Sequence, residues 1–145
     1  MPASTLTTFD DLAEQIGKGI HDFSTHTFKL ALTNSAPNAA THDELADITQ
    51  ISSGGGYTAG AGGGYTLTSV GYTETGGTAT LATTSPFTIT ASGGSVGPFQ
   101  YLVIYNDTST GDKLVGFYNY GSALTLADGE SLAITSASGH LTVTA

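Results

Sequence analysis

A glycine-rich pentapeptide, residues 93–97, is the stretch of the sequence that most resembles a catalytic motif. It reads Gly-Gly-Ser-Val-Gly and matches the G-x-S-x-G pattern, in which the serine (here Ser95) is a nucleophile. Asp112 or Asp128 followed by His140 even gives the chain order of an α/β-hydrolase triad. That motif requires a strand, a tight turn and then a helix. Here Pro98 and an extended apolar stretch follow, so we favour a glycine-rich hairpin loop and predict no catalytic residue and no enzyme activity.

Metal-ligating residue types occur, but without the spacing of a metal site. His42 lies beside the acidic residues of 43–47, and an acidic helix cap with a solvated face accounts for this group. Asp107 and Asp112 bracket a polar turn that lacks the further acidic ligands of a calcium loop, so an Asx turn is the better interpretation. We therefore predict no metal and no cofactor. The remaining histidines, His21, His26 and His140, show no ligand spacing either.

Tyrosines offer a different chemistry, stacking on sugar rings. Trp is absent, which weakens this interpretation because its larger ring usually stacks best. Tyrosine on a strand is more often half-buried packing with its hydroxyl at the rim. Glycan binding is therefore the alternative rather than the main prediction. The candidates are Tyr57, Tyr65, Tyr72, Tyr118 and Tyr120.

The charge balance excludes two classes of partner. The 145-residue chain carries three lysines, no arginine and twelve acidic residues, for a net charge of −9. Three scattered cations cannot neutralise a row of phosphates or an anionic membrane surface, so we expect neither nucleic acid nor membrane as a partner. The start, residues 1–5, has no basic and apolar regions of a secretory signal, which favours assembly in a cytoplasm. With 25 threonines and 14 serines, the expected surface is hydroxyl-rich and suits close packing in an array.

The N-terminal segment, residues 1–24, is predicted to be an arm and a short amphipathic helix. Apolar residues recur at three- and four-residue spacing from Phe9 to Phe23, and Thr7 or Thr8 can cap the helix. Gly17 and Gly19 lower the helix propensity of the second half of this segment. The apolar stripe consists of Phe9, Leu12, Ala13, Ile16, Ile20 and Phe23.

Residues 25–145 are predicted to form one antiparallel β-sandwich or jelly-roll-like domain. Short stretches with a period of two alternate with Gly and Asn/Asp turns, and no βαβ alternation occurs. The stretch 98–106 is apolar on both faces and is expected at the centre of a sheet. One or two helical turns are expected within 41–48, with Thr41 as the cap. The other strands are expected near 26–33, 65–73, 78–83, 86–91, 112–119, 122–126, 130–136 and 139–144.

The glycine-rich stretch 54–64 begins with Gly-Gly-Gly-Tyr-Thr at residues 54–58, and the same five residues recur at 62–66. The first copy fits the loose dinucleotide-binding pattern, but no helix follows it to bind a pyrophosphate. Such a density of glycine favours a loop or a bulged edge. We expect this loop to be mobile unless a partner orders it.

Several longer stretches of the sequence are distinctive. They are Thr27-Phe28-Lys29-Leu30-Ala31-Leu32-Thr33-Asn34-Ser35-Ala36-Pro37, residues 45–49 and 56–60, Ala91-Ser92-Gly93-Gly94-Ser95-Val96-Gly97-Pro98-Phe99 with Tyr101, Tyr105-Asn106-Asp107, and residues 120–122 and 126–130. These stretches resemble a family of small structural proteins from the virions of tailed bacteriophages. The similarity covers most of the chain, and the expanded glycine run 60–64 is its main departure.

The resemblance implies a capsid decoration, or cement, protein on the surface of the virion. Such a protein binds the outer face of the major capsid protein shell and stabilises it, here as a homodimer or homotrimer. We expect residues 1–23 and the 54–64 loop to contact the shell. The alternative is a receptor- or glycan-binding module of a phage head fibre or tail. The candidate partner-contact residues are Phe9, Leu12, Ile16, Tyr57 and Tyr65.

Overall fold

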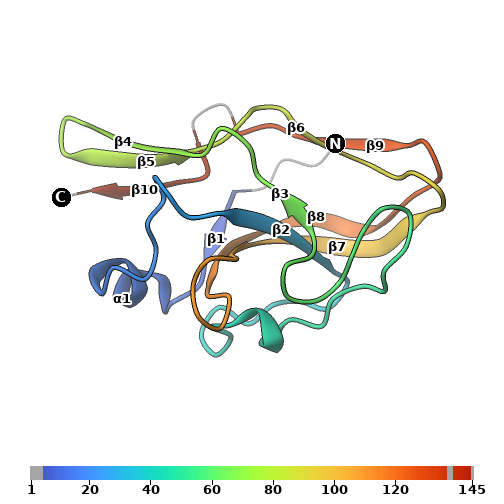
Figure 1. Cartoon of the computed structure of the whole chain (residues 1–145), viewed down its shortest axis with the longest axis horizontal. Helices are drawn as coiled ribbons and strands as arrows, with labels where there is room; N and C mark the ends of the chain where they lie inside the picture. The colour runs from blue at the N-terminus through green and yellow to red at the C-terminus, as the bar shows by residue number, and fades with distance from the viewer. Residues whose placement is uncertain (1–4, 137–138, 145) are drawn as a thin grey trace.

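The computed structural model describes residues 5–136 and 139–144 and shows a two-layer β-sandwich with one short helix at its side (Figure 1). All strand pairs are antiparallel, so the predicted mainly-β antiparallel fold with a short N-terminal helix is confirmed. The elements are β1 (Thr7–Thr8), α1 (Leu12–Gly17), β2 (Phe28–Thr33), the 3-10 helix η1 (Leu45–Asp47), β3 (Tyr65–Thr66), β4 (Gly71–Thr75), β5 (Thr78–Ala82), β6 (Phe87–Thr90), β7 (Val96–Asn106), β8 (Leu114–Leu126), β9 (Ser131–Ile134) and β10 (Leu141–Thr144).

The lower layer is a five-stranded sheet in the order β1-β8-β7-β2-β3. The long strand β7 lies in its middle, between β8 and β2, which confirms the central position expected from its two apolar faces. Both faces of this part of the sheet are covered. Phe28, Leu30 and Leu32 of β2 belong to the core between the layers, whereas Ala31 belongs to a second cluster with Val103 and other buried residues.

The upper layer consists of two ladders that follow one another along the top of Figure 1. One contains β10, β5 and β4 in that order, and the other pairs β6 with β9. In the order of the chain β5 precedes β6 and β9 precedes β10, and β4 adds a third strand beside β5 in the first ladder only. Between the ladders, the Ser136 N–H donates to Ser85 Oγ at 3.0 Å and the His140 N–H donates to the Leu81 carbonyl at 2.7 Å.

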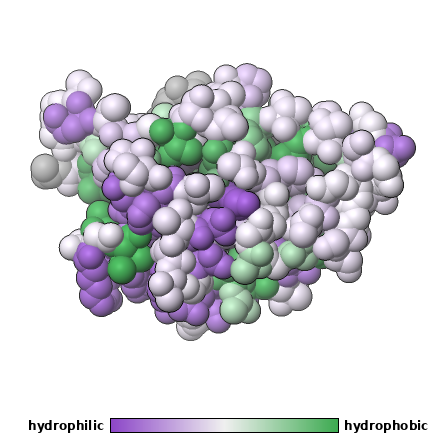
Figure 2. All heavy atoms as spheres, in the orientation of Figure 1, coloured by the Kyte–Doolittle hydropathy of each residue, from purple (hydrophilic) through white to green (hydrophobic). Residues whose placement is uncertain are grey.

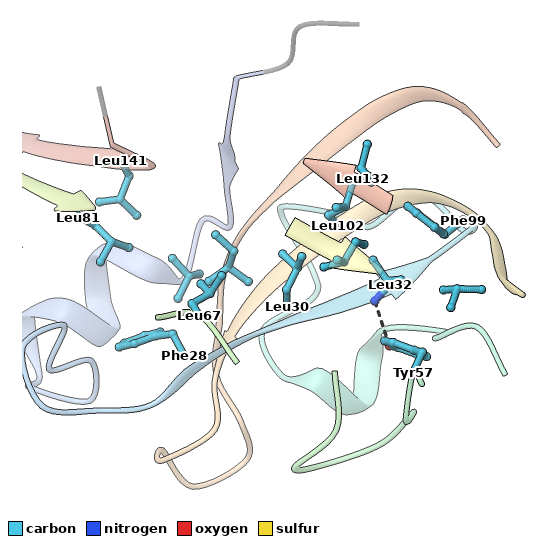
Figure 3. Packing of buried hydrophobic residues seen from close by; sticks show 14 of the residues in the cluster. Phe28, Leu30, Leu32, Tyr57, Leu67, Leu81, Phe99, Leu102, Leu132 and Leu141 are labelled. Carbon is cyan, nitrogen blue, oxygen red and sulfur yellow. Dashed lines mark hydrogen bonds between the residues drawn. The ribbon is translucent and has the colours of Figure 1, made fainter. Parts of the chain in front are cut away.

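The main core lies between the two layers (Figure 3). Leu81 of β5 and Leu141 of β10 are paired across the upper ladder and point down onto the lower sheet. Leu132 of β9 does the same at the other end of the layer. Apolar burial of this kind contributes roughly 25 cal/mol per Å², so the period-two pattern of the strands decides which face lies inside.

The N-terminal segment differs from the prediction in two ways. The helix spans only Leu12–Gly17, and Asp11 occupies its N-cap without a side-chain cap hydrogen bond. Thr7 and Thr8, expected as caps, form the edge strand β1 and pair with β8. The segment predicted as an arm therefore supplies a strand to the lower sheet. Gly17 ends the helix, in line with the low helix propensity of glycine.

Two local predictions were wrong for identifiable reasons. The helical turn begins at Glu44 and not at Thr41, because Asp47 accepts the backbone N–H groups of Asp43 and Glu44 and closes a capping box there. The strands expected at 112–119 and 122–126 are one strand, β8. In place of the expected break between two strands there is a bulge, in which the residues from Asn119 to Leu124 oppose only Phe99–Tyr101 of β7.

Candidate partner-contact surface

The five candidate contact residues divide into two groups, one under the glycine-rich loop and one at the N-terminus. Tyr57 and Tyr65 belong to the first group, and their rings contact each other with centroids 5.7 Å apart. Tyr57 is only 2 % exposed, so in this structure its ring packs inside the sandwich and presents almost no surface to a partner. Its hydroxyl accepts the Leu32 N–H at 3.0 Å and donates to Gln50 Oε1 at 2.6 Å. Burial raises the pKa of this hydroxyl to about 12.

The glycine-rich loop is fastened to the sandwich by the chain itself, contrary to the expectation that a partner would order it. The Tyr105 hydroxyl donates to the Gly63 carbonyl at 2.6 Å, and Lys29 Nζ donates to the Gly62 carbonyl at 2.8 Å. Gly64 has a φ of +78°, and a Cβ there would collide with the Leu30 carbonyl. Glycine is therefore needed at this position for a close approach to β2 and not for mobility.

The other tyrosines do not form an exposed stacking surface. Tyr65 is half-buried, and its hydroxyl has no hydrogen-bond partner among the described residues. Tyr72 packs against Phe23 with ring centroids 5.0 Å apart. Tyr118 and Tyr120 are half-buried and pack against the main core. Every tyrosine of the chain is buried or half-buried, so none stands clear of the sandwich.

The N-terminal candidates line an open groove of about 430 Å³ between α1 and β10. Figure 2 shows apolar atoms at this place, at the left of the molecule between the end of the upper layer and α1. Phe9 and Leu12 are 1 % and 6 % exposed, so they line the groove while most of each side chain is buried in the sandwich. Ile16 is half-buried and remains accessible. The groove is lined by Thr8, Phe9, Asp10, Leu12, Ala13, Ile16, Leu141, Thr142 and Val143.

The opposite wall of this groove was not predicted from the sequence. Val143 is 39 % exposed and is the one exposed large hydrophobic side chain among the described residues. It shares a face of β10 with Leu141, which is buried in the core. Alternation along β10 was visible in the sequence, but nothing in it placed this strand beside α1.

The serine and histidine of the hydrolase-like pattern do not meet. Both ring nitrogens of His140 have other partners, since Nδ1 lies 2.7 Å from the Tyr118 hydroxyl and Nε2 lies 2.7 Å from Thr83 Oγ1. Asp128 accepts the Gly93 N–H at 3.0 Å and so closes the loop that carries Ser95. The pentapeptide runs directly into β7 and no helix follows it, but the hairpin prediction was wrong, because β6 pairs with β9 and β7 pairs with β8 and β2, so the loop connects two sheets. His140 instead joins the two layers of the sandwich, and its burial lowers its pKa.

The acidic residues beside His42 bind the chain's own groups. Lys113 Nζ contacts Glu44 Oε1 at 2.9 Å and Asp43 Oδ2 at 3.9 Å. Asp47 caps the helical turn. Among the described residues, no three His, Asp or Glu side chains gather in a way that holds a metal ion. None of the described helices is both long and apolar enough to span a membrane.

All three lysines are already ion-paired within the chain. Lys18 pairs with Glu14 on α1, Lys29 Nζ lies 3.8 Å from Asp107 Oδ2, and Lys113 pairs as described above. The remaining carboxylates therefore dominate the electrostatic field around the protein, which carries a net charge of −9.

Comparison with protein-family models, with curated proteins and with solved structures finds no match to this chain. The function must therefore be inferred from the residues themselves and from the surface that they form.

Proposed function

We propose that the chain is a capsid decoration protein of a tailed bacteriophage, which binds the outer surface of the major capsid protein shell and stabilises it. In this proposal it is a structural component of the virion, a homodimer or homotrimer that assembles in the cytoplasm of a bacterial host. It needs no cofactor, and its partners are the shell protein and further copies of itself.

The observation that carries the proposal is the resemblance of most of the sequence to small virion proteins of tailed phages. Two features of the structure support it. The groove between α1 and β10 presents Ile16 and Val143 to a partner at the surface of an otherwise closed sandwich. The loop with the hydrolase-like serine pattern is closed by a hydrogen bond from Gly93 to Asp128, and the acidic residue Glu44 pairs with Lys113, so both groups contact the chain itself.

The copy number of the chain in purified virions tests the proposal. Quantitative mass spectrometry of the particle is expected to give a stoichiometry comparable to that of the major shell protein, because a decoration protein covers the lattice. A second assay adds the purified chain to shells that lack it and measures the temperature at which the shells open. An increase is expected, because a ligand that binds only the intact form stabilises that form. A handful of copies per particle, with no effect on shell opening, would contradict the proposal.

A low copy number with no effect on shell opening would favour the alternative function, which is glycan or receptor recognition by a head fibre or tail. The structure offers this alternative little support, because the tyrosines on which it depends are buried or half-buried. Screening the purified chain on a glycan array, with Tyr65→Ala as the variant, separates the two functions. Binding that the variant abolishes would favour glycan recognition.

A further inference from the structure

The groove between α1 and β10 has the form of a site for an extended polypeptide. Of the described strands, only β5 pairs with β10, so the other edge of β10 has no strand beside it. In Figure 1, β10 is the strand of its ladder nearest to α1, and residues of both elements line the groove. The N–H and C=O groups along a sheet edge can pair with an added strand, and a helix beside the edge can hold its side chains.

We propose that this groove binds an extended segment of a partner protein, which lies along β10, inserts an apolar side chain between Ile16 and Val143, and places a lysine or arginine near Asp10. The inference rests on the proposed function only for the identity of the partner, the shell protein. The chemistry of the segment follows from the groove itself.

The apolar part of the segment follows from the lining of the groove. Its volume of about 430 Å³ lies within the roughly 300–1,000 Å³ typical of ligand sites, which is sufficient for apolar side chains of a bound strand. Phe9 and Leu12 close its floor, so an inserted side chain meets apolar atoms from below and from both walls. Burying the exposed part of Val143 removes apolar surface from water and favours binding.

The cationic part of the segment follows from the charges. Asp10 is exposed at the groove and has no ion pair among the described residues. The three lysines of the chain, Lys18, Lys29 and Lys113, each contact a carboxylate other than Asp10. A second copy of the chain would instead bring another net charge of −9. The electrostatics therefore favour a different protein with a basic residue as the occupant.

Selection from a random heptapeptide display library against the full-length chain tests the inference without a capsid. Binders are expected to share one apolar position with a lysine or arginine close to it. Val143→Asp on one wall and Ala13→Glu on the other are each expected to weaken the selected peptides at least tenfold, because each puts a charge into the apolar groove. Thr75→Asp is the matched control, since it adds the same charge on the opposite edge strand β4 and is expected to leave affinity unchanged.

A charge swap tests the contact with Asp10. Asp10→Lys is expected to weaken the selected peptides and to restore binding of versions in which glutamate replaces the basic residue. Peptides without a shared cation, or binding that Val143→Asp and Ala13→Glu leave within twofold of wild type, would overturn the inference. Urea unfolding of each variant shows whether it is folded. Dimerisation that both groove variants abolish would also overturn it, because a second copy would then be the occupant.

The two proposals fail in different ways. If the wild-type chain does not bind shells but selects groove-dependent peptides, the capsid function is wrong and the groove inference stands. If the wild-type chain binds shells and both groove variants bind them equally well, the capsid function stands and the groove inference is wrong.

Discussion

The histidine pair next to Asn106 predicts a loss of stability in mild acid. Asn106 is fully buried, and its Oδ1 accepts the backbone N–H groups of Thr108 at 3.0 Å and Ser109 at 3.2 Å. Its amide nitrogen therefore donates, and it lies 3.1 Å from Nδ1 of His21 and 3.0 Å from Nδ1 of His26. The Ile20 carbonyl is a third acceptor, 3.3 Å from the same nitrogen. Nδ1 of His21 can accept from the amide only while it carries no proton.

Protonation of His21 at Nδ1 would place two donors opposite each other and remove its hydrogen bond with Asn106. Burial, and next the neighbouring His26, lower the pKa of His21 to about 4, and Lys113 acts in the same sense. The Leu114 backbone and Asp11 each raise the pKa of His21, but by less than burial and His26 lower it. The unfolded chain, with a histidine pKa of 6.5, therefore binds a proton between pH 6.5 and pH 4 that the native protein does not bind. Stability is complete above this window and falls as the pH decreases through it.

The size of the effect follows from the two pKa values. At pH 5 the loss amounts to about 2 kcal/mol relative to pH 7.5, and below pH 4 it approaches roughly 3 kcal/mol. Urea unfolding at pH 7.5 and pH 5 measures it. In His21→Gln, a side-chain oxygen can accept from Asn106 without titrating, so the variant is expected to lose about 2 kcal/mol less than wild type over this range. His42→Gln, on a surface loop, is the matched control.

The comparison between variants isolates His21 because His140 and the carboxylates are present in both proteins. The reasoning is refuted if wild type loses less than about 0.5 kcal/mol between the two pH values, or if His21→Gln retains the full loss. Equal behaviour of His42→Gln and wild type is expected, since the His42 ring accepts the Asn38 N–H in an exposed hydrogen bond that a glutamine oxygen can also accept.

Two further predictions concern the glycine-rich loop, and urea unfolding measures both. Gly62→Ala and Gly64→Ala both place an alanine at a φ near +77°, which costs roughly 1–2 kcal/mol. Only Gly64→Ala also collides with the Leu30 carbonyl, so it is expected to cost about 1–3 kcal/mol more, and equal losses would contradict the packing of the loop. Tyr57→Phe leaves the buried Leu32 N–H without its acceptor and is expected to cost about 1–3 kcal/mol, whereas no measurable loss would show the hydroxyl to be dispensable.

The strand pattern of the fold was predictable because alternation and turn residues act locally. β5, β6, β9 and β10 lie close to where the sequence placed them. The division of β8 into two strands was wrong because β7 pairs with residues on both sides of Gly121, and the extra residues form a bulge. Local turn signals cannot reveal a long neighbouring strand that keeps the chain extended.

The surroundings of the candidate residues were harder to predict, because they depend on which segments, distant in the sequence, lie side by side in the fold. His21 and His26 showed no ligand spacing, yet the turn between α1 and β2 brings both rings to Asn106. Tyr57, set among glycines, suggested an exposed loop tip. In fact the glycines let the backbone approach the sheet closely, and the tyrosine ring fills the space between them. Glycine density is therefore as consistent with close packing as with mobility.

The pairing of the lysines bears most directly on how this protein can bind a partner. The net charge could be counted from the sequence, but the ion pairs could not be predicted from it. Lys29 pairs with Asp107, 78 positions away in the chain, and Lys113 pairs with Glu44, 69 positions away. Once these cations are paired, further copies of the chain repel one another except where their contacts are uncharged. A basic partner is attracted to every copy. Binding to a cationic surface should therefore weaken as salt rises, whereas self-association should strengthen, and measuring both against ionic strength separates the two kinds of contact.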